Sequence, residues 1–304
     1  MPLHRHSRIV VGIPVYNEER FVVDCIRSMQ AQTERDFLCV ISDNASTDGT
    51  EEACRRAIDG DARFVYVRQP HNIGSSPNVN FLRSATESPY FAWIGSHDRV
   101  KPDFLRLHLD FLDTHPECPV SYTYWEWIDA EGRVVGREPI KGLGELWGGG
   151  WSRYLWSIES GEVCGLQGVM RREVLPEQLM RNCPGCDHVL LSTLVFKGRF
   201  NVLPQRLYQA RRFVEAVRPA DYMERITGKK GHRRDLTELV RAFEEEFELL
   251  PAPASEKDRW RRLAHWIIRD KFAPDSRRWH RKFAISSTIR KLRALRRWNW
   301  LFAR

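Results

Sequence analysis

A nearly continuous apolar run, Arg8-Ile-Val-Val-Gly-Ile-Pro-Val-Tyr16, leads directly into the polar residues Asn17-Glu18-Glu19. Strands that are buried on both faces of a parallel sheet have such uninterrupted apolar sequences. The abrupt change to polar residues marks the end of the strand. We therefore expect a buried parallel strand here, with a polar loop at its carboxyl end.

Further strand-like and helix-like segments alternate after this run. Short apolar runs predict strands over residues 37–41, 64–67 and 90–94, and apolar side chains at helical spacing predict helices between them. The alternation predicts an α/β fold, with a parallel sheet and right-handed crossovers. The helices are expected over residues 19–32 and 77–87, from Asp48 with Glu51 three positions later, and from Pro102 at the first helical position to about residue 115.

Polar clusters follow each of the four predicted strands. They are Asn17-Glu18, Asp43, the segment 71–76, and His97-Asp98. Ligands of parallel α/β sheets bind at the carboxyl ends of the strands. The four clusters therefore predict one binding site at that edge of the sheet.

The sequence changes character after residue 119. An aromatic-rich strand is expected over residues 120–128, with a return strand over 133–136. The Gly- and Trp-rich segment from Leu143 to Trp156 predicts a mobile loop over a site. Beyond it we expect a helix over 185–197, an extended segment over 199–210, and an all-helical region after residue 218 with a break at Pro251-Ala-Pro253.

The composition is that of a globular protein. The chain has 304 residues, of which 42% are apolar and 29% are charged, and this excludes wholesale disorder. No stretch approaches about 18 uninterrupted apolar residues, so we expect no membrane-spanning helix. The N-terminus lacks the apolar segment of a signal peptide, which predicts a cytoplasmic protein.

Cysteine usage indicates reduced thiols. The seven cysteines are an odd number spread over a long chain, which argues against a disulfide framework. Cys183-Pro-Gly-Cys186 is a single CxxC pair, whereas a structural zinc site needs four ligands. A turn beside a helix start and a zinc or redox site are the two interpretations of this pair.

The positive charge lies in the C-terminal region. Residues 251–304 carry 16 Lys/Arg against 4 Asp/Glu, a net charge of +12, whereas the remainder carries −4. Five tryptophans and an apolar stripe from Ile285 to Trp300 accompany this charge, and basic amphipathic helices with Trp lie on anionic bilayers. We expect residues 255–304 to contact an anionic membrane. The alternative is a helical layer packed on the rest of the protein; nucleic-acid binding is disfavoured, because the tail alone carries the charge.

Five segments follow one another in a characteristic order at the predicted strand ends. They are Val15-Tyr-Asn-Glu18, Ser42-Asp-Asn-Ala-Ser-Thr-Asp-Gly-Thr50, His71-Asn-Ile-Gly74 through Asn80, Ser96-His-Asp98 and Gly185-Cys-Asp187. With these segments, residues 1–215 resemble a family 2 glycosyltransferase with a GT-A fold. The resemblance implies a GT-A sheet flanked by helices, with a nucleotide half over about 1–100, an acceptor half over about 101–215, and a helical basic extension over 216–304.

The resemblance implies transfer of a sugar, with inversion, from a nucleotide-diphosphate donor to a hydroxyl of a cell-surface glycan or lipid-linked acceptor. A UDP-sugar is the first expectation, with GDP- and dTDP-sugars as alternatives. Asp43 would read the base, unless it forms an Asx-turn, and Gly74 could simply satisfy a turn. The donor-binding residues implied are Pro14, Tyr16, Glu18, Asp43, Asn72, Gly74, Asn80, His97, Asp98 and Arg99.

The acidic motif of the family departs from its usual pattern here. It reads Ser96-His97-Asp98-Arg99, in which Asp98 matches the second carboxylate, the usual metal ligand, and Ser96 replaces the first. The resemblance implies Mg²⁺ or Mn²⁺ on the diphosphate, where a hard cation neutralises the leaving group. Arg99 would instead contact phosphate directly or point to solvent.

Asp187 falls where the family carries its catalytic base. Inverting transfer needs a carboxylate that deprotonates the acceptor hydroxyl, although an Asp at a helix start can also be an N-cap. Arg211 and Arg212 could reach the diphosphate or an anionic acceptor, or be solvated.

Two other functions use the same fold. A catalytically silent nucleotide-sugar-binding protein would explain the incomplete acidic motif. A sugar nucleotidyltransferase would need a Gly-rich, basic phosphate loop after the first strand, where this chain has Asn17-Glu18-Glu19.

Overall fold

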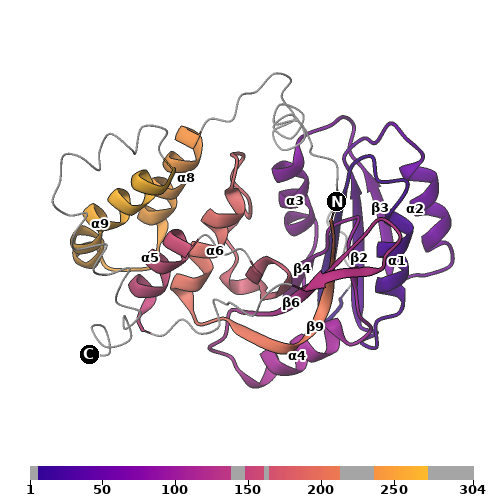
Figure 1. Cartoon of the computed structure of the whole chain (residues 1–304), viewed down its shortest axis with the longest axis horizontal. Coiled ribbons are helices and arrows are strands. Elements are labelled where there is room, and N and C mark those ends of the chain that lie inside the picture. The colour runs from indigo at the N-terminus through magenta and orange to yellow at the C-terminus, as the bar shows by residue number, and fades with distance from the viewer. Residues whose placement is uncertain (1–5, 138–147, 161–163, 213–235, 273–304) are drawn as a thin grey trace.

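The computed structural model describes residues 6–137, 148–160, 164–212 and 236–272. In these ranges the strands form one mixed sheet in the order β3-β2-β1-β4-β8-β6-β9-β5, and β7 pairs with β6 (Figure 1). The strands are β1 Ile9–Val15, β2 Phe37–Asp43, β3 Phe64–Arg68, β4 Tyr90–Trp93, β5 Arg99–Val100, β6 Val120–Ile128, β7 Val134–Arg137, β8 Gly168–Arg171 and β9 Asn201–Arg211. The helices are α1 Val22–Gln30, α2 Thr50–Ile58, α3 Ser75–Ser84, α4 Phe104–Thr114, α5 Gly150–Ser160, α6 Cys186–Lys197, α8 Leu236–Leu249 and α9 Ala254–Phe272.

The predicted parallel half of the sheet is confirmed. β1 pairs in parallel with both β2 and β4, and β2 pairs in parallel with β3. The register places Val15 beside Asp43, so the polar loops after β1 and β2 leave the same edge of the sheet. The apolar runs form strands because both of their faces are covered.

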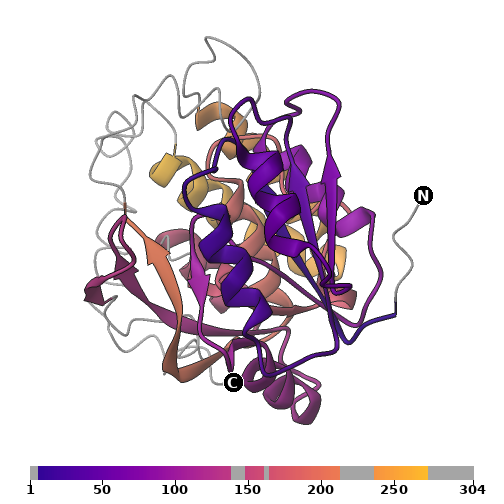
Figure 2. The ribbon, with the colours of Figure 1, turned by 90° about the vertical axis from the view of Figure 1, so that its right-hand side faces the viewer.

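Helices cover the two faces of these strands. α1 and α2 lie on one face and α3 on the other (Figures 1 and 2). Gly12 of β1 lies under α3, and a Cβ there would be 2.8 Å from Leu82 Cδ1. The glycine therefore allows α3 to approach the sheet closely.

The second half of the sheet is antiparallel in part. β8 pairs antiparallel with β4 and β6, and β9 runs parallel to β6 and antiparallel to the two-residue strand β5. β5 and β8 were not predicted from the sequence. Through β5, the segment that follows β4 pairs with β9, which lies more than 100 residues later in the chain.

The prediction of a loop from Leu143 to Trp156 is wrong for its second part, because α5 begins at Gly150. Trp151, Tyr154, Leu155 and Ile158 have helical spacing and form a buried stripe. The three glycines at positions 148–150 stand at the start of this helix, and because glycine is a poor helix former they favoured the interpretation as a loop. Residues 143–147 lie outside the described ranges. A smaller difference concerns α4, which begins at Phe104, so that Pro102 precedes the helix.

A second apolar core lies beside the sheet. It joins α5 and α6 to α8 and α9, and its buried residues include Phe243, Phe247 and Ile268. Trp260 and Trp266 of α9 are partly buried against it. For α9, therefore, the packing alternative is confirmed. The amphipathic stripe from Ile285 to Trp300 lies outside the described residues. None of the helices described is long and apolar enough to cross a bilayer.

Candidate active site

A hydrogen bond between side chains connects the carboxyl ends of β1 and β4. The His97 imidazole, through Nδ1, lies 3.0 Å from Glu18 Oε1, and the Glu18 side chain is largely buried. Pro14 and Tyr16, at the end of β1, are half-buried. The structure thus brings together residues that the sequence places about 80 positions apart.

Asp98 is enclosed by the second half of the sheet. Its Oδ2 accepts a hydrogen bond from the Tyr208 hydroxyl at 2.8 Å, and its Oδ1 accepts one from the Arg211 backbone N–H at 2.8 Å. The residue is 9% exposed, and burial raises the pKa of its carboxyl group. His97 Nε2 lies 3.8 Å from Asp98 Oδ1. Sequence reasoning missed Tyr208, because nothing in its local pattern separates it from an ordinary strand residue.

The Arg211 side chain is buried and structural. Its guanidinium donates to the carbonyl oxygens of His97, Asp129 and Ala130, and it pairs with Asp24 at 3.2 Å. These contacts hold the loop after β4 against the β6–β7 turn. Contact with solvent, one of the two expectations for this residue, is therefore wrong. The neighbouring Arg212 lies over the Trp127 ring.

Arg99 differs from the expectation that it points to solvent, and its contact with phosphate stays a prediction. Its guanidinium donates to the Gly132 carbonyl oxygen at 2.5 Å, and the residue is half-buried. Gly132 has a φ of +81°, and a Cβ there would lie 2.6 Å from the guanidinium. Arg99 therefore connects the acidic motif to the β6–β7 turn instead of pointing to solvent.

Asp43 is fully buried at the end of β2. Its Oδ1 accepts from the Ser46 N–H and hydroxyl at 2.8 and 2.6 Å, and its Oδ2 accepts from the Tyr66 hydroxyl and from Arg68. The bonds to Ser46 are those of an Asp that shapes its own loop. Contact with a nucleotide base stays a prediction, and this arrangement favours the structural alternative.

The loop before α3 needs its glycine. Gly74 has a φ of +90°, a conformation that L-residues with a side chain rarely adopt. Its N–H donates to Asn72 Oδ1, which also accepts from the Asn44 amide at 2.8 Å. Asn80, which was predicted to lie beside the donor, uses its side-chain amide to bond the main chain of Met180.

Asp187 lies in the first turn of α6. The N-cap residue is Gly185, with a φ of +75°, and no side chain caps the helix, so the N-cap interpretation of Asp187 is wrong. The half-buried Asp187 carboxylate makes no hydrogen bond or ion pair with the residues that the structure describes. The preceding Cys186 Sγ lies 3.5 Å from Ser76 Oγ, which places the start of α6 against the start of α3.

The Cys183 thiol of the CxxC pair is buried, and that of Cys186 is half-buried. Burial raises the pKa of the Cys183 thiol to about 12 and that of the Cys186 thiol to about 11. Thiols with such pKa values are protonated near neutral pH, whereas thiolates bind metals and react. Within the described ranges, no three His, Cys, Asp or Glu side chains group as metal ligands. Cys186 is the first residue of α6 and Cys183 lies three residues before it, which fits the interpretation as a turn beside a helix start.

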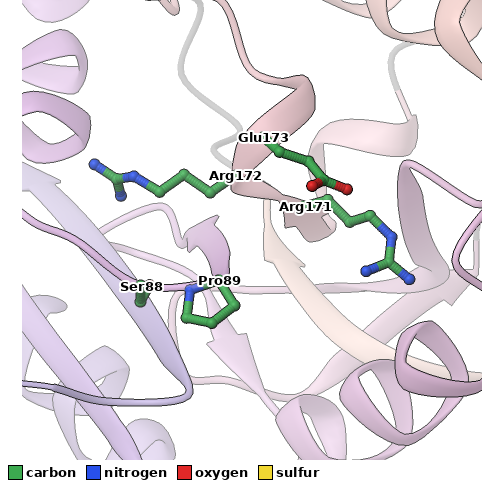
Figure 3. A pocket seen from close by; sticks show the side chains of 5 residues that line it. All are labelled: Ser88, Pro89, Arg171, Arg172 and Glu173. Atoms are coloured by element: carbon green, nitrogen blue, oxygen red, sulfur yellow. The ribbon is translucent and has the colours of Figure 1, made fainter.

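A surface hollow of about 370 Å³ lies away from these residues. Ser88, Pro89, Arg171, Arg172 and Glu173 line it (Figure 3). Ser88 and Pro89 precede β4, whereas His97 and Asp98 follow it. The hollow is therefore separate from the site predicted at the carboxyl ends of the strands.

Comparisons with known proteins agree with this architecture. The family model described as "Glycosyl transferase family 2" matches residues 10–150. The putative teichuronic acid biosynthesis glycosyltransferase TuaG of Bacillus subtilis is 27% identical over 129 residues, which cover 42% of this chain and 51% of TuaG. The matched region covers about half or less of the first curated relatives.

Two solved structures share the fold. S. aureus TarS 1–349 in complex with UDP-GlcNAc has a TM-score of 0.60 and 16% identity, over 86% of this chain and 71% of that chain. The mannosyltransferase PcManGT from Pyrobaculum calidifontis, in complex with GDP-Man and Mn²⁺, has a TM-score of 0.52 and 16% identity, over 96% and 81%.

The mixed sheet and the polar strand ends of this chain match the GT-A fold of these two solved structures. More specifically, residues 10–150, a little less than half of the chain, match the model of glycosyl transferase family 2. The resemblance predicted from the sequence is therefore confirmed, together with the fold class.

Proposed function

We propose that this chain is an inverting glycosyltransferase that moves a sugar from a nucleotide-diphosphate sugar to a hydroxyl of a glycan or a lipid-linked acceptor. One observation carries the proposal: the ends of β1, β2 and β4 meet at one edge of a GT-A sheet, and α6, with Asp187, begins beside α3. TarS binds UDP-GlcNAc, which supports a UDP-sugar donor. PcManGT binds GDP-Man, so a GDP-sugar is the alternative, followed by a dTDP-sugar.

The residues at the end of β4 fit a divalent cation with two protein ligands. A metal-bound histidine commonly donates its other ring N–H to a carboxylate, and Glu18 is placed to accept from His97 Nδ1. His97 Nε2 and Asp98 Oδ1, 3.8 Å apart, would then be the ligands. Imidazole and carboxylate ligands suit Mn²⁺, whereas Mg²⁺ is usually held by one or two carboxylates with substrate phosphates. When bound, the cation would neutralise the leaving diphosphate.

Asp187 is the proposed general base. Its carboxylate would take the proton of the acceptor hydroxyl as the hydroxyl oxygen attacks the anomeric carbon. Attack from the face opposite the leaving diphosphate inverts the configuration at that carbon. The absence of a hydrogen-bonding or ion-pair partner for this carboxylate among the described residues supports the role, since a base must be available to substrate.

The acceptor proposal rests on the relatives and on the basic C-terminal region. TuaG is named for teichuronic acid biosynthesis, which supports a glycan acceptor. The net charge of +12 over residues 251–304 supports attachment to an anionic membrane, at the cytoplasmic face where a lipid-linked acceptor would lie.

The test is a nucleotide-sugar panel. UDP-, GDP-, dTDP- and CMP-sugars are first screened for thermal stabilisation of the full chain, and the binders are then assayed for slow hydrolysis and for transfer to simple glycosides. Transfer with inversion supports the proposal. Stabilisation by a nucleotide without hydrolysis or transfer, even with Mn²⁺ and lipid-linked acceptors, would contradict it.

A catalytically silent nucleotide-sugar-binding protein is the second candidate. The observation that favours it is Ser96, which is buried and supplies no charge where the family carries its first carboxylate. The same panel separates the two functions, because a silent protein binds donor without cleaving it.

A further inference from the structure

One face of α3 contacts the segment that leads to the proposed base. This segment, residues 172–186, connects the end of β8 to the start of α6, and we call it the strap. It begins at Arg172, whose guanidinium donates to the carbonyl oxygens of Arg83 and Thr86 at the end of α3. In Figure 3 the Arg171 and Arg172 side chains point in different directions, and Arg171 bonds instead to the end of α4.

Polar contacts continue along the whole strap. Arg83 donates to the Leu175 carbonyl oxygen at 3.5 Å, Asn80 bonds Met180, and Ser76 contacts Cys186. Positions 76, 80 and 83 are spaced by four and three residues, so they share one face of the helix. Their partners have decreasing numbers, which means that the strap runs antiparallel to α3.

Asn80 makes the central contact of this series. Its Oδ1 accepts from the Met180 N–H at 2.7 Å, and its Nδ2 donates to the Met180 carbonyl oxygen at 2.8 Å. Met180 is buried, so without Asn80 both of its main-chain groups would lose these partners in an apolar environment. Asparagine thus fixes the strap in one register on the helix.

The start of α3 explains why this register matters. The helix begins directly after Gly74, in the loop predicted to pass beside the donor, and Ser76 in its first turn contacts the residue before Asp187. A strap that slid along α3 would move the first turn of α6 relative to that loop. Displacement of a catalytic group by about 1 Å can cost on the order of 100-fold in rate.

We propose that Asn80 is a positioning residue: it holds the strap on α3 and thereby sets the place of Asp187 relative to the donor. The proposal rests on the proposed function, in which Asp187 is the base. It replaces direct donor contact, the role that the sequence suggested for Asn80, because both groups of the amide are already bonded to Met180.

The test compares full-length Asn80→Ala with Ser84→Ala, a control on an exposed position of the same helix. We expect Asn80→Ala to lower kcat for transfer by about 10- to 100-fold. The KM for donor and the affinity for the free nucleotide should change less than twofold. Asn80→Asp keeps the acceptor for the Met180 N–H and should recover part of kcat. Ser84→Ala should behave as wild type.

A double variant separates positioning from an independent effect. In the Asp187→Asn background, Asn80→Ala should cause little further loss, because it acts through Asp187. A loss that multiplies in the double variant, or a loss of nucleotide affinity equal to the loss of rate, would overturn the proposal. The proposal would also be overturned if Asn80→Ala had the same kcat as an active wild-type chain. If the wild-type chain binds nucleotide but transfers nothing, the proposed function itself fails.

If Asn80→Ala unfolds, Asn80→Asp and hydrogen exchange keep the test decisive. Exchange should rise in residues 180–190 of Asn80→Asp and stay unchanged in β1 and β2. Unchanged exchange in residues 180–190 would contradict the attachment of the strap through Asn80.

Discussion

The fold shields the carboxyl group of Asp98 from water on most sides. Tyr208 and the main chain of Arg211 bond its two oxygens. In Asp98→Asn, the amide oxygen can still accept one of these bonds, so the fold should persist. The variant lacks the negative charge of the proposed cation site, and we expect it to lose nearly all transfer. Near-wild-type turnover at saturating Mn²⁺ would show that Asp98 does not hold the cation.

Asp187→Asn tests the base. The substitution keeps the size of the side chain and removes its ability to take a proton, so the chemical step should slow by about 10²- to 10⁴-fold. Donor affinity should survive, because the residue acts on the acceptor. Single-turnover transfer and nucleotide titration measure the two quantities separately. If affinity falls as much as rate, Asp187 is a donor-binding or structural residue.

His108 links stability to pH. It is fully buried in α4, its Nδ1 lies 2.8 Å from Ser121 Oγ, and burial lowers its pKa to about 3. In the unfolded chain the pKa is about 6.5. Between these values the unfolded state binds more protons, so the free energy of unfolding should fall as pH decreases, by about 1.4 kcal/mol per pH unit.

Urea unfolding at pH 7, 6 and 5 measures this dependence. His108→Gln, which does not titrate, should reduce the decline in the free energy of unfolding between pH 7 and pH 5 by about 2 kcal/mol. An equally steep decline in the variant would assign the pH dependence to other groups.

At the scale of elements, the start of α6 depends on the glycine at position 185. Its φ of +75° is in the left-handed region, where an L-residue costs about 1–2 kcal/mol. A Cβ there would also lie 3.1 Å from Leu239 Cδ2 of α8. Gly185→Ala should therefore lower the free energy of unfolding by roughly this amount and reduce transfer, since Asp187 follows two residues later. Chemical denaturation and a transfer assay measure the two effects, and a variant unchanged in both would refute the assignment.

The sequence was sufficient to predict those elements whose signal is local. β1 to β4 are short apolar runs that end in polar clusters, and α1 has apolar side chains at helical spacing. β5 has only two residues, and its pairing with β9 depends on contacts across more than 100 positions. The motif Ser96-His97-Asp98 predicted Asp98 as a site residue because its signal is local. It carried no information on Tyr208 or on the main-chain contact to Arg211, because these partners lie more than 100 positions later in the chain. Similarly, the sequence singled out the segment from His71 to Asn80, but it did not show that Asn80 bonds Met180, 100 positions later.

At the scale of the whole molecule, the C-terminal region divides into a packed part and a charged part. α9 buries Ala264, Ile267 and Ile268 in the second core. Removal of residues 251–304 should therefore expose this core and give an insoluble chain or one with an unfolded acceptor half. Removal of residues 273–304, which carry ten Lys/Arg and one Asp, should leave the described helices in place.

We expect that removal of residues 273–304 abolishes membrane binding. We expect the full chain, but not the chain ending at residue 272, to sediment with vesicles rich in anionic lipid. Salt should weaken this binding, because exposed charges are screened over about 10 Å at 0.1 M. Neutral vesicles are the control. Equal sedimentation of both chains would show that residues 273–304 are not the membrane anchor.

The second core also has a consequence for biosynthesis. β1 to β4 pair with one another within the first 93 residues, and this part of the polypeptide leaves the ribosome first. Asp98 gains its contacts to Tyr208 and Arg211 only after β9 has been made, and α6 completes its packing only when α9 has emerged. A nascent chain would thus assemble the predicted nucleotide half first and the helix with the proposed base last. A ribosome-bound intermediate could hold a donor before it was able to use one.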